Sequence, residues 1–293
     1  MKRHLKLVAI LCNLWIGTLL SVNAGQTDVK ENVAHASESN EISFMELIQC
    51  ARDAQLKRDY SSALDYLEIA KTISEEKSDK SLLVCVFIQL SDLYLTAGQR
   101  NEAESFGYKA LEMTSSIEDA ALNASSLNNW GNILIQYEDY YAAIDAYDES
   151  FTLSKDSGNL DASLRALSNL VRTALIIDDL EIVYDALEDA RSLFKEMTGE
   201  LSKQWQMQFA IHSQALIKKG PEPEIRDELI EWVETIWQEI AATAEQNKDI
   251  VLKSRAYGNL GTLYESKGDY PAALQSLRRA LFAAESAQRF EMS

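Results

Sequence analysis

The 293-residue sequence is 46% apolar, which is enough to build a sizeable buried core and excludes a chain that is disordered throughout. Its eleven glycines and three prolines leave few turn signals for a many-stranded sheet, so the composition favours long helices. With 28 basic and 46 acidic side chains the formal charge is −18, which makes nucleic acids and anionic membranes poor partners.

The first 24 residues have the composition of a secretory signal peptide. Basic residues precede an apolar run from Leu7 to Leu20, and small residues end the segment at Ala24. The run has about 14 residues, whereas a membrane-spanning helix needs roughly 20. The pattern predicts a cleaved leader over residues 1–24 and a secreted or periplasmic product without an integral membrane span. A retained signal anchor is the alternative.

Residues 25–42 show no apolar periodicity, so we expect a flexible tether between the leader and the folded part. The folded part is predicted to begin at Ser43. Ser43 and Glu46 have the spacing of a capping box, in which a hydroxyl and a carboxylate three residues apart satisfy backbone amides at the start of a helix.

From residue 44 the sequence repeats itself at an interval of 40 residues. Large apolar residues recur at helical spacing within each unit, which is typical of two amphipathic helices. Small side chains recur in columns, as expected where two helices cross closely. Three such columns are Ala51, Ser91, Gly131 and Val171; Ala63, Ala103, Ala143 and Val183; and Ala70, Ala110, Ser150 and Ala190.

The last unit, residues 254–293, resembles the tetratricopeptide repeat. That repeat has an aromatic residue, then Leu-Gly, then Tyr, then Ala with a large apolar residue four positions later. The 40-residue interval exceeds the roughly 34 residues of the common repeat and is similar to kinesin-light-chain-like repeats. The residues that match the pattern are Tyr257, Leu260, Gly261, Tyr264, Ala273 and Leu277.

The resemblance implies an all-α fold, a right-handed superhelical solenoid of about six helical hairpins. Four hairpins are expected over residues 43–199, and one clear tetratricopeptide hairpin over 254–293, after which the array is expected to be truncated. A degenerate hairpin is expected over 200–253. Its first helix is predicted at Gln204–Lys219 and its second at Glu224–Gln246, separated by a break at residues 220–223.

The sequence offers little material for catalysis. Only His35 and His212 remain after the leader, and no phosphate-binding loop, dinucleotide-binding fingerprint or zinc motif is present. We therefore predict no catalytic residue, no cofactor and no metal site. Beyond the leader the cysteines are Cys50 and Cys85; two free thiols are favoured over a single disulfide between them.

Amide side chains form a further column at the same interval, one residue before a Leu-small or equivalent pair. In similar superhelical arrays the first helices line a concave groove, so the resemblance implies that these amides bind the backbone of an extended peptide. Arginines on the same helices are expected to pair with acidic groups of the ligand. The alternative is that the amides hydrogen-bond across neighbouring repeats. The amides are Gln49, Gln89, Asn129, Asn169 and Asn259, and the arginines are Arg165, Arg172 and Arg255.

We therefore predict an exported module that binds a protein or peptide in its groove, with no nucleic acid as partner. The leader and the 40-residue repeats also resemble the amino-terminal region of bacterial exported CHAT-domain proteins. That resemblance implies an alternative, in which this chain is the recognition region of a larger caspase-like peptidase with a following catalytic domain. A scaffold for envelope assembly is a third alternative.

Overall fold

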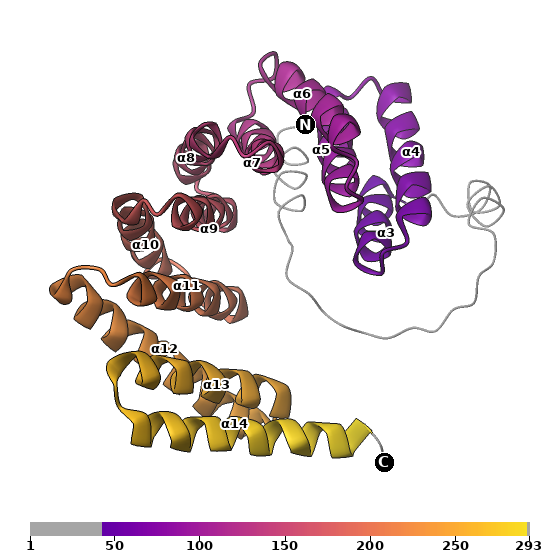
Figure 1. Cartoon of the computed structure of the whole chain (residues 1–293). Coiled ribbons are helices and arrows are strands. Elements are labelled where there is room, and N and C mark those ends of the chain that lie inside the picture. The colour runs from indigo at the N-terminus through magenta and orange to yellow at the C-terminus, as the bar shows by residue number, and fades with distance from the viewer. Residues whose placement is uncertain (1–42, 292–293) are drawn as a thin grey trace. The chain divides into compact units, whose positions relative to one another are not determined.

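The computed structural model describes residues 43–291, and this range contains twelve helices, α3 to α14, and no strand (Figure 1). The predicted all-α class is therefore confirmed. The predicted leader (1–24) and tether (25–42) lie outside the described residues. Within α9 the chain divides into two compact units: residues up to Thr173 belong to unit 1, and residues from Ala174 belong to unit 2.

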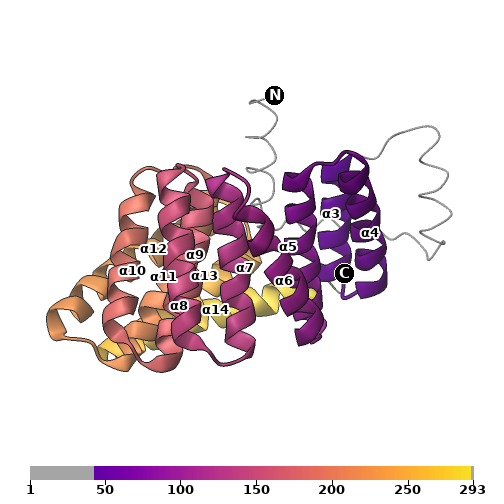
Figure 2. The ribbon, with the colours of Figure 1, turned by 90° about the horizontal axis from the view of Figure 1, so that it is seen from above.

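Unit 1 is a stack of helical hairpins. Consecutive helices pack against each other, and the first helix of one hairpin also contacts the first helix of the next. Figure 2 shows α3 to α6 side by side in this arrangement. The helices are α3 (Phe44–Leu56), α4 (Tyr60–Glu76), α5 (Lys80–Thr96), α6 (Arg100–Thr114), α7 (Ala120–Gln136), α8 (Tyr140–Asp156) and α9 (Leu160–Ile177).

The start of α3 confirms the predicted capping box. The backbone N–H of Ser43 donates to Glu46 Oε2 at 2.7 Å, and the backbone N–H of Glu46 donates to the Ser43 hydroxyl at 3.3 Å. Both orphan donors at this helix end are thereby satisfied.

Most turns between helices use one aspartate twice. The backbone N–H of Asp59 donates to the Ala54 carbonyl at 2.9 Å and closes α3, while its carboxylate accepts from Ser62 N–H at 3.2 Å and opens α4. The residue before it, Arg58, has φ 60°, the left-handed conformation typical of a helix end. Part of the chain's acidity therefore serves to cap helices. The same pairing of bonds recurs at Asp79, Asp139, Asp179, Asp249 and Asp269.

The columns of small residues lie where helices meet, as predicted. Ala63, Ala103 and Ala143 are fully buried. Gly131 in α7 faces the ring of Tyr147 in α8, and a Cβ atom added to this glycine would lie 2.5 Å from a ring carbon. A methyl group at that position would push the two helices apart.

Unit 2 confirms the divergent hairpin. The predicted break is present, since Gly220 is left-handed at φ 76° and Pro223 begins the next helix. The first helix of this hairpin starts four residues earlier than Gln204, because the chain turns at Gly199, whose φ is 86°. In Figure 1, α13 and α14 lie side by side. The helices are α10 (Leu180–Phe194), α11 (Glu200–Lys219), α12 (Pro223–Asn247), α13 (Ile250–Lys267) and α14 (Tyr270–Glu291).

The core of unit 2 holds a large aromatic side chain on a polar partner. Trp237 is fully buried, and its indole Nε1 donates to Gln214 Oε1 at 3.2 Å. The amide of Gln214 in turn donates to the Asn259 carbonyl at 2.9 Å, which ties α11 to α13. A buried indole N–H that lacked such an acceptor would cost stability.

Candidate functional site

Unit 1 contains a groove of about 690 Å³. Nearly all of its lining comes from the first helices of the hairpins, α3, α5, α7 and the part of α9 that belongs to unit 1. This is the wall that the repeat pattern predicted for a groove. The side chains that line it are mostly amides, arginines and aliphatic residues.

Five of the eight predicted site residues line this groove: Gln89, Asn129, Asn169, Arg165 and Arg172. The other three lie elsewhere.

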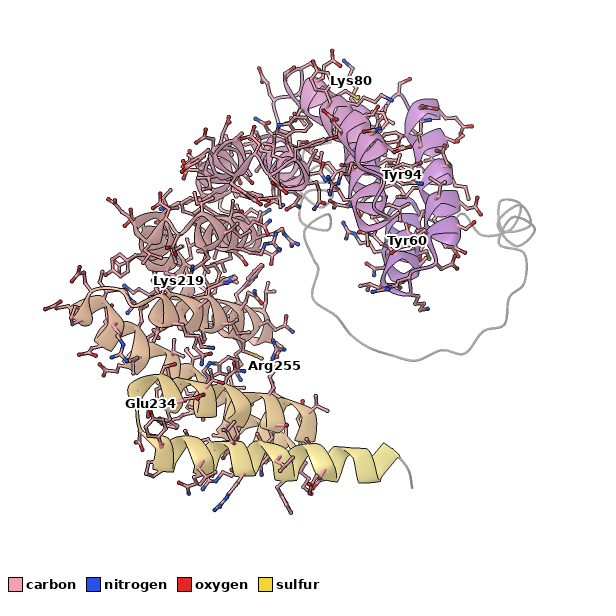
Figure 3. The ribbon with its side chains drawn as sticks, viewed as in Figure 1. Tyr60, Lys80, Tyr94, Lys219, Glu234 and Arg255 are labelled. Carbon is pink, nitrogen blue, oxygen red and sulfur yellow. The ribbon has the colours of Figure 1, made fainter. Side chains whose placement is uncertain are left out.

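Gln49 is exposed on α3 and donates to Asp53 Oδ1 of the same helix at 2.8 Å. Arg255, labelled in Figure 3, and Asn259 lie on α13 in unit 2. The Asn259 amide donates to the Arg255 carbonyl at 2.9 Å. These three residues are therefore outside the groove of unit 1.

The amides in the groove hydrogen-bond between neighbouring first helices. Gln89 Oε1 accepts from Arg52 Nε at 2.9 Å, and Asn129 Nδ2 donates to Asp92 Oδ1 at 2.7 Å. Asn169 Nδ2 continues the series by donating to an amide oxygen on α7, that of Asn128, at 2.9 Å. Each amide thus ties its helix to the preceding repeat, which is the alternative role that the sequence left open. Asn129 is only 2% exposed, so a peptide backbone has little access to it.

A second polar column lines the groove and was missed in the sequence. It lies three residues after the amide column, on the same face of each first helix, and it has the same interval of 40 residues. The repeat period was a sufficient signal for it, but its chemistry changes from one repeat to the next. Its members are Arg52, Asp92, Asn132 and Arg172.

The groove carries more positive than negative charge. Four arginines and one carboxylate line it, in a chain whose formal charge is −18. Arg165 is offset by Asp161, whose carboxylate lies 2.7 Å from the guanidinium. Arg172 is exposed and donates one hydrogen bond, of 3.1 Å, to Asn169 Oδ1. A guanidinium has five N–H donors, so Arg172 retains donors for a ligand.

The one carboxylate in the groove is Asp92. Burial raises its pKa to about 6, while the hydrogen bond from Asn129 and the positive charges of Arg52 and Arg165 act in the opposite direction. The charge of the groove therefore changes in the mildly acidic range. No other residue type with an ordinary pKa near 6 competes there, because residues 43–173 include no histidine.

The arrangement offers hydrogen bonds and charge rather than reactive groups. Among residues 43–291, no three His, Cys, Asp or Glu side chains gather as a metal site. In the same range, no helix is both long and apolar enough to cross a bilayer. Cys50 and Cys85 are free thiols, and burial raises the pKa of Cys50, which disfavours its reactive thiolate.

Comparisons with known proteins agree with the repeat pattern. Residues 254–285 match the family model of the tetratricopeptide repeat. No protein of curated function matches the sequence.

Solved structures share the fold at low sequence identity. BtubC (BKLC) from P. vanneervenii is 19% identical with a TM-score of 0.62, and the match covers 80% of this chain and 92% of that one. A putative kinesin light chain of Podospora anserina with TPR-like repeats is 15% identical with a TM-score of 0.52, covering 69% and 95%. The Rap conjugation gene regulator of the plasmid pLS20, in complex with the Phr* peptide, is 16% identical with a TM-score of 0.51, covering 92% and 81%. The chain therefore contains a tetratricopeptide repeat at residues 254–285 and shares the helical-hairpin fold of kinesin-light-chain-like repeat proteins.

Proposed function

We propose that the chain is a protein-interaction module whose unit 1 groove binds a peptide segment rich in carboxylates. The observation that carries this proposal is the surplus of arginine over carboxylate in the groove of an otherwise acidic chain. The tetratricopeptide fold suggests protein binding, and it is generally non-catalytic. A peptide ligand is further supported by the Rap regulator, a neighbour of similar fold that was solved with a peptide bound.

The positions of the polar groups suggest how recognition divides. The amide column is occupied in tying repeats together, so side chains that project beyond it make the ligand contacts. Arg172 and Arg58 are exposed at the groove, and their planar guanidinium groups suit bidentate bonds to a carboxylate. The amide bonds between first helices hold these arginines in place, which reduces the ordering cost of binding.

Charge reversal at Arg172 tests the proposal. The probe is a fluorescein-labelled ten-residue aspartate–serine peptide, and the matched probe has asparagine in place of aspartate. Arg172→Glu should weaken binding of the acidic peptide about fivefold, since an exposed charge contributes of the order of 0.5 kcal/mol and reversal counts twice. Fluorescence anisotropy at fixed ionic strength measures the affinity.

Arg255→Glu is the matched control, because Arg255 is also exposed on a first helix but lies outside the groove. It should leave the affinity unchanged. Equal losses in both variants would show that the acidic peptide responds only to the net charge of the chain. Equal binding of the acidic and asparagine probes would contradict a carboxylate-binding groove.

We also propose that this interaction takes place after export. The basic and apolar composition of residues 1–24 supports cleavage after Ala24. Mass spectrometry of the protein recovered from the source cells should give a mature chain that starts at Gly25. Recovery of a chain that retains residues 1–24 would instead favour the signal-anchor alternative.

A further inference from the structure

The outer face of α14 exposes a line of large apolar side chains. Eleven large apolar residues are exposed among the described residues, and five of them lie on this one helix. Four of the five follow the spacing 4-3-4, which places them in a single stripe along the helix. The stripe consists of Tyr270, Leu274, Leu277 and Leu281, and Phe282 lies beside it.

The stripe is not part of the contact between α14 and α13. The face of α14 that packs on α13 is built from small residues, Ala273, Ser276 and Ala283, which are at most 7% exposed. In contrast, Tyr270 is 70% exposed and Leu281 is 61% exposed. A row of leucines in water at this density is unusual for a surface helix that has no partner.

Basic side chains accompany the stripe. Arg278 and Arg279 lie on α14, and between Tyr270 and Ala284 that helix carries no carboxylate. Arg279 lies over the Tyr257 ring, 5.2 Å from its centroid. Arg278 is exposed and forms no ion pair with any residue that the structure describes. A hollow of about 590 Å³ beside the stripe is lined by Leu274, Arg278 and Phe282 among others.

We propose that this face of α14 binds an amphipathic helix of another protein, with apolar residues at heptad spacing and carboxylates flanking them. A stripe with 4-3-4 spacing is the pattern that a second helix fills side by side. The uncompensated Arg278 selects acidic flanks in the partner. This surface lies in unit 2 and does not depend on the groove of unit 1.

A second copy of the chain fits this face less well. Pairing two α14 helices would place Arg278 and Arg279 of both copies along one seam, and no carboxylate of α14 between Tyr270 and Ala284 would face them. Like charges held close in this way disfavour association. The occupant is therefore expected to be a different, acidic helix.

Designed helical peptides test the proposal with the full chain. The first probe is a labelled peptide of about three heptads with leucine at the a and d positions and glutamate at e and g. The second has lysine in place of glutamate, and the third has serine in place of leucine. The glutamate probe should bind about fivefold or more tightly than the lysine probe, and the serine probe should not bind.

Substitutions on the chain give the decisive comparison. Arg278→Glu should reverse the preference between the glutamate and lysine probes, and Leu281→Ser should abolish binding of both. Tyr141→Ser is the matched control, because Tyr141 is 70% exposed on α8 in unit 1. Circular dichroism should show the same helix content in all variants.

Several results would overturn the proposal. These are equal binding of the glutamate and lysine probes, an Arg278→Glu variant with unchanged preference, and a Leu281→Ser variant that binds like the wild type. Analytical ultracentrifugation adds one more: a wild-type dimer that Leu281→Ser dissociates would identify a second copy as the occupant.

Discussion

Replacing Gly131 with alanine is expected to lower the free energy of unfolding by about 2 kcal/mol, although alanine is the better helix former. The added Cβ would lie 2.5 Å and 2.8 Å from carbons of the Tyr147 ring. This ring is fully buried, and its hydroxyl donates to Asn132 Oδ1 at 2.8 Å. The ring can therefore yield only by giving up that bond or by separating α7 from α8.

Gly258 provides a matched control, because a Cβ added at this helical glycine meets no atom within 4 Å. Gly258→Ala should raise the free energy of unfolding by up to about 1 kcal/mol through helix propensity alone. Urea unfolding followed by circular dichroism measures both changes. If the two alanines stabilise the chain equally, the close crossing of α7 and α8 is not a constraint.

Asp92→Asn is expected to remove a pH dependence of peptide binding. In the wild type, the affinity for the aspartate–serine peptide should rise about tenfold from pH 7.5 to pH 5. The carboxyl of Asp92, whose pKa is about 6, is charged at the higher pH and neutral at the lower one. The peptide's own carboxylates have pKa values of about 3.9 and remain charged.

The size of this effect follows from the place of the charge. A half-buried carboxylate several ångströms from a ligand charge acts through an effective dielectric constant near 20, which is worth about 1.4 kcal/mol or tenfold. The Asp92→Asn variant should bind tightly at both pH values. Asp148→Asn, on the exposed side of α8, should keep the wild-type profile. A wild-type profile in Asp92→Asn would show that another group governs the pH dependence.

The same residue couples pH to stability. Because the pKa of Asp92 is raised on folding, the folded chain takes up a proton more readily than the unfolded chain. Its contribution to stability is therefore complete below about pH 4 and is lost as the pH rises through about 6. Urea unfolding at pH 5 and pH 7.5 should show this dependence in the wild type and a smaller one in Asp92→Asn.

The helical architecture was predictable because it depends on local patterns. Helix periodicity, the capping box at Ser43 and the small residues at 40-residue intervals each act within one hairpin, and each is visible in one stretch of sequence. The break at Gly220 was predictable for the same reason, since glycine and proline act on their own backbone. Only the start of α11 was misplaced, because Gly199 lets the chain turn before the apolar pattern begins.

The groove was only partly predictable, because its polar contacts join different repeats. The amide column was found from its period, yet the bond partners of Asn129 and Asn169 depend on how adjacent first helices approach. Arg52 and Asp92 share a column but carry opposite charges, so a search for uniform chemistry passes over them. Arg255 matched the pattern locally but lies in the other unit, which no local pattern reveals.

The shared aspartates at the turns bear on how such an array changes length. At Asp59 and Asp139 one residue ends a helix with its backbone and begins the next with its side chain, so each junction satisfies its own polar groups. Cutting the chain at two equivalent junctions and rejoining it leaves every helix end capped as before. A duplication or deletion of 40 residues in register is therefore neutral for the backbone, and the array can gain or lose a repeat in a single genetic event.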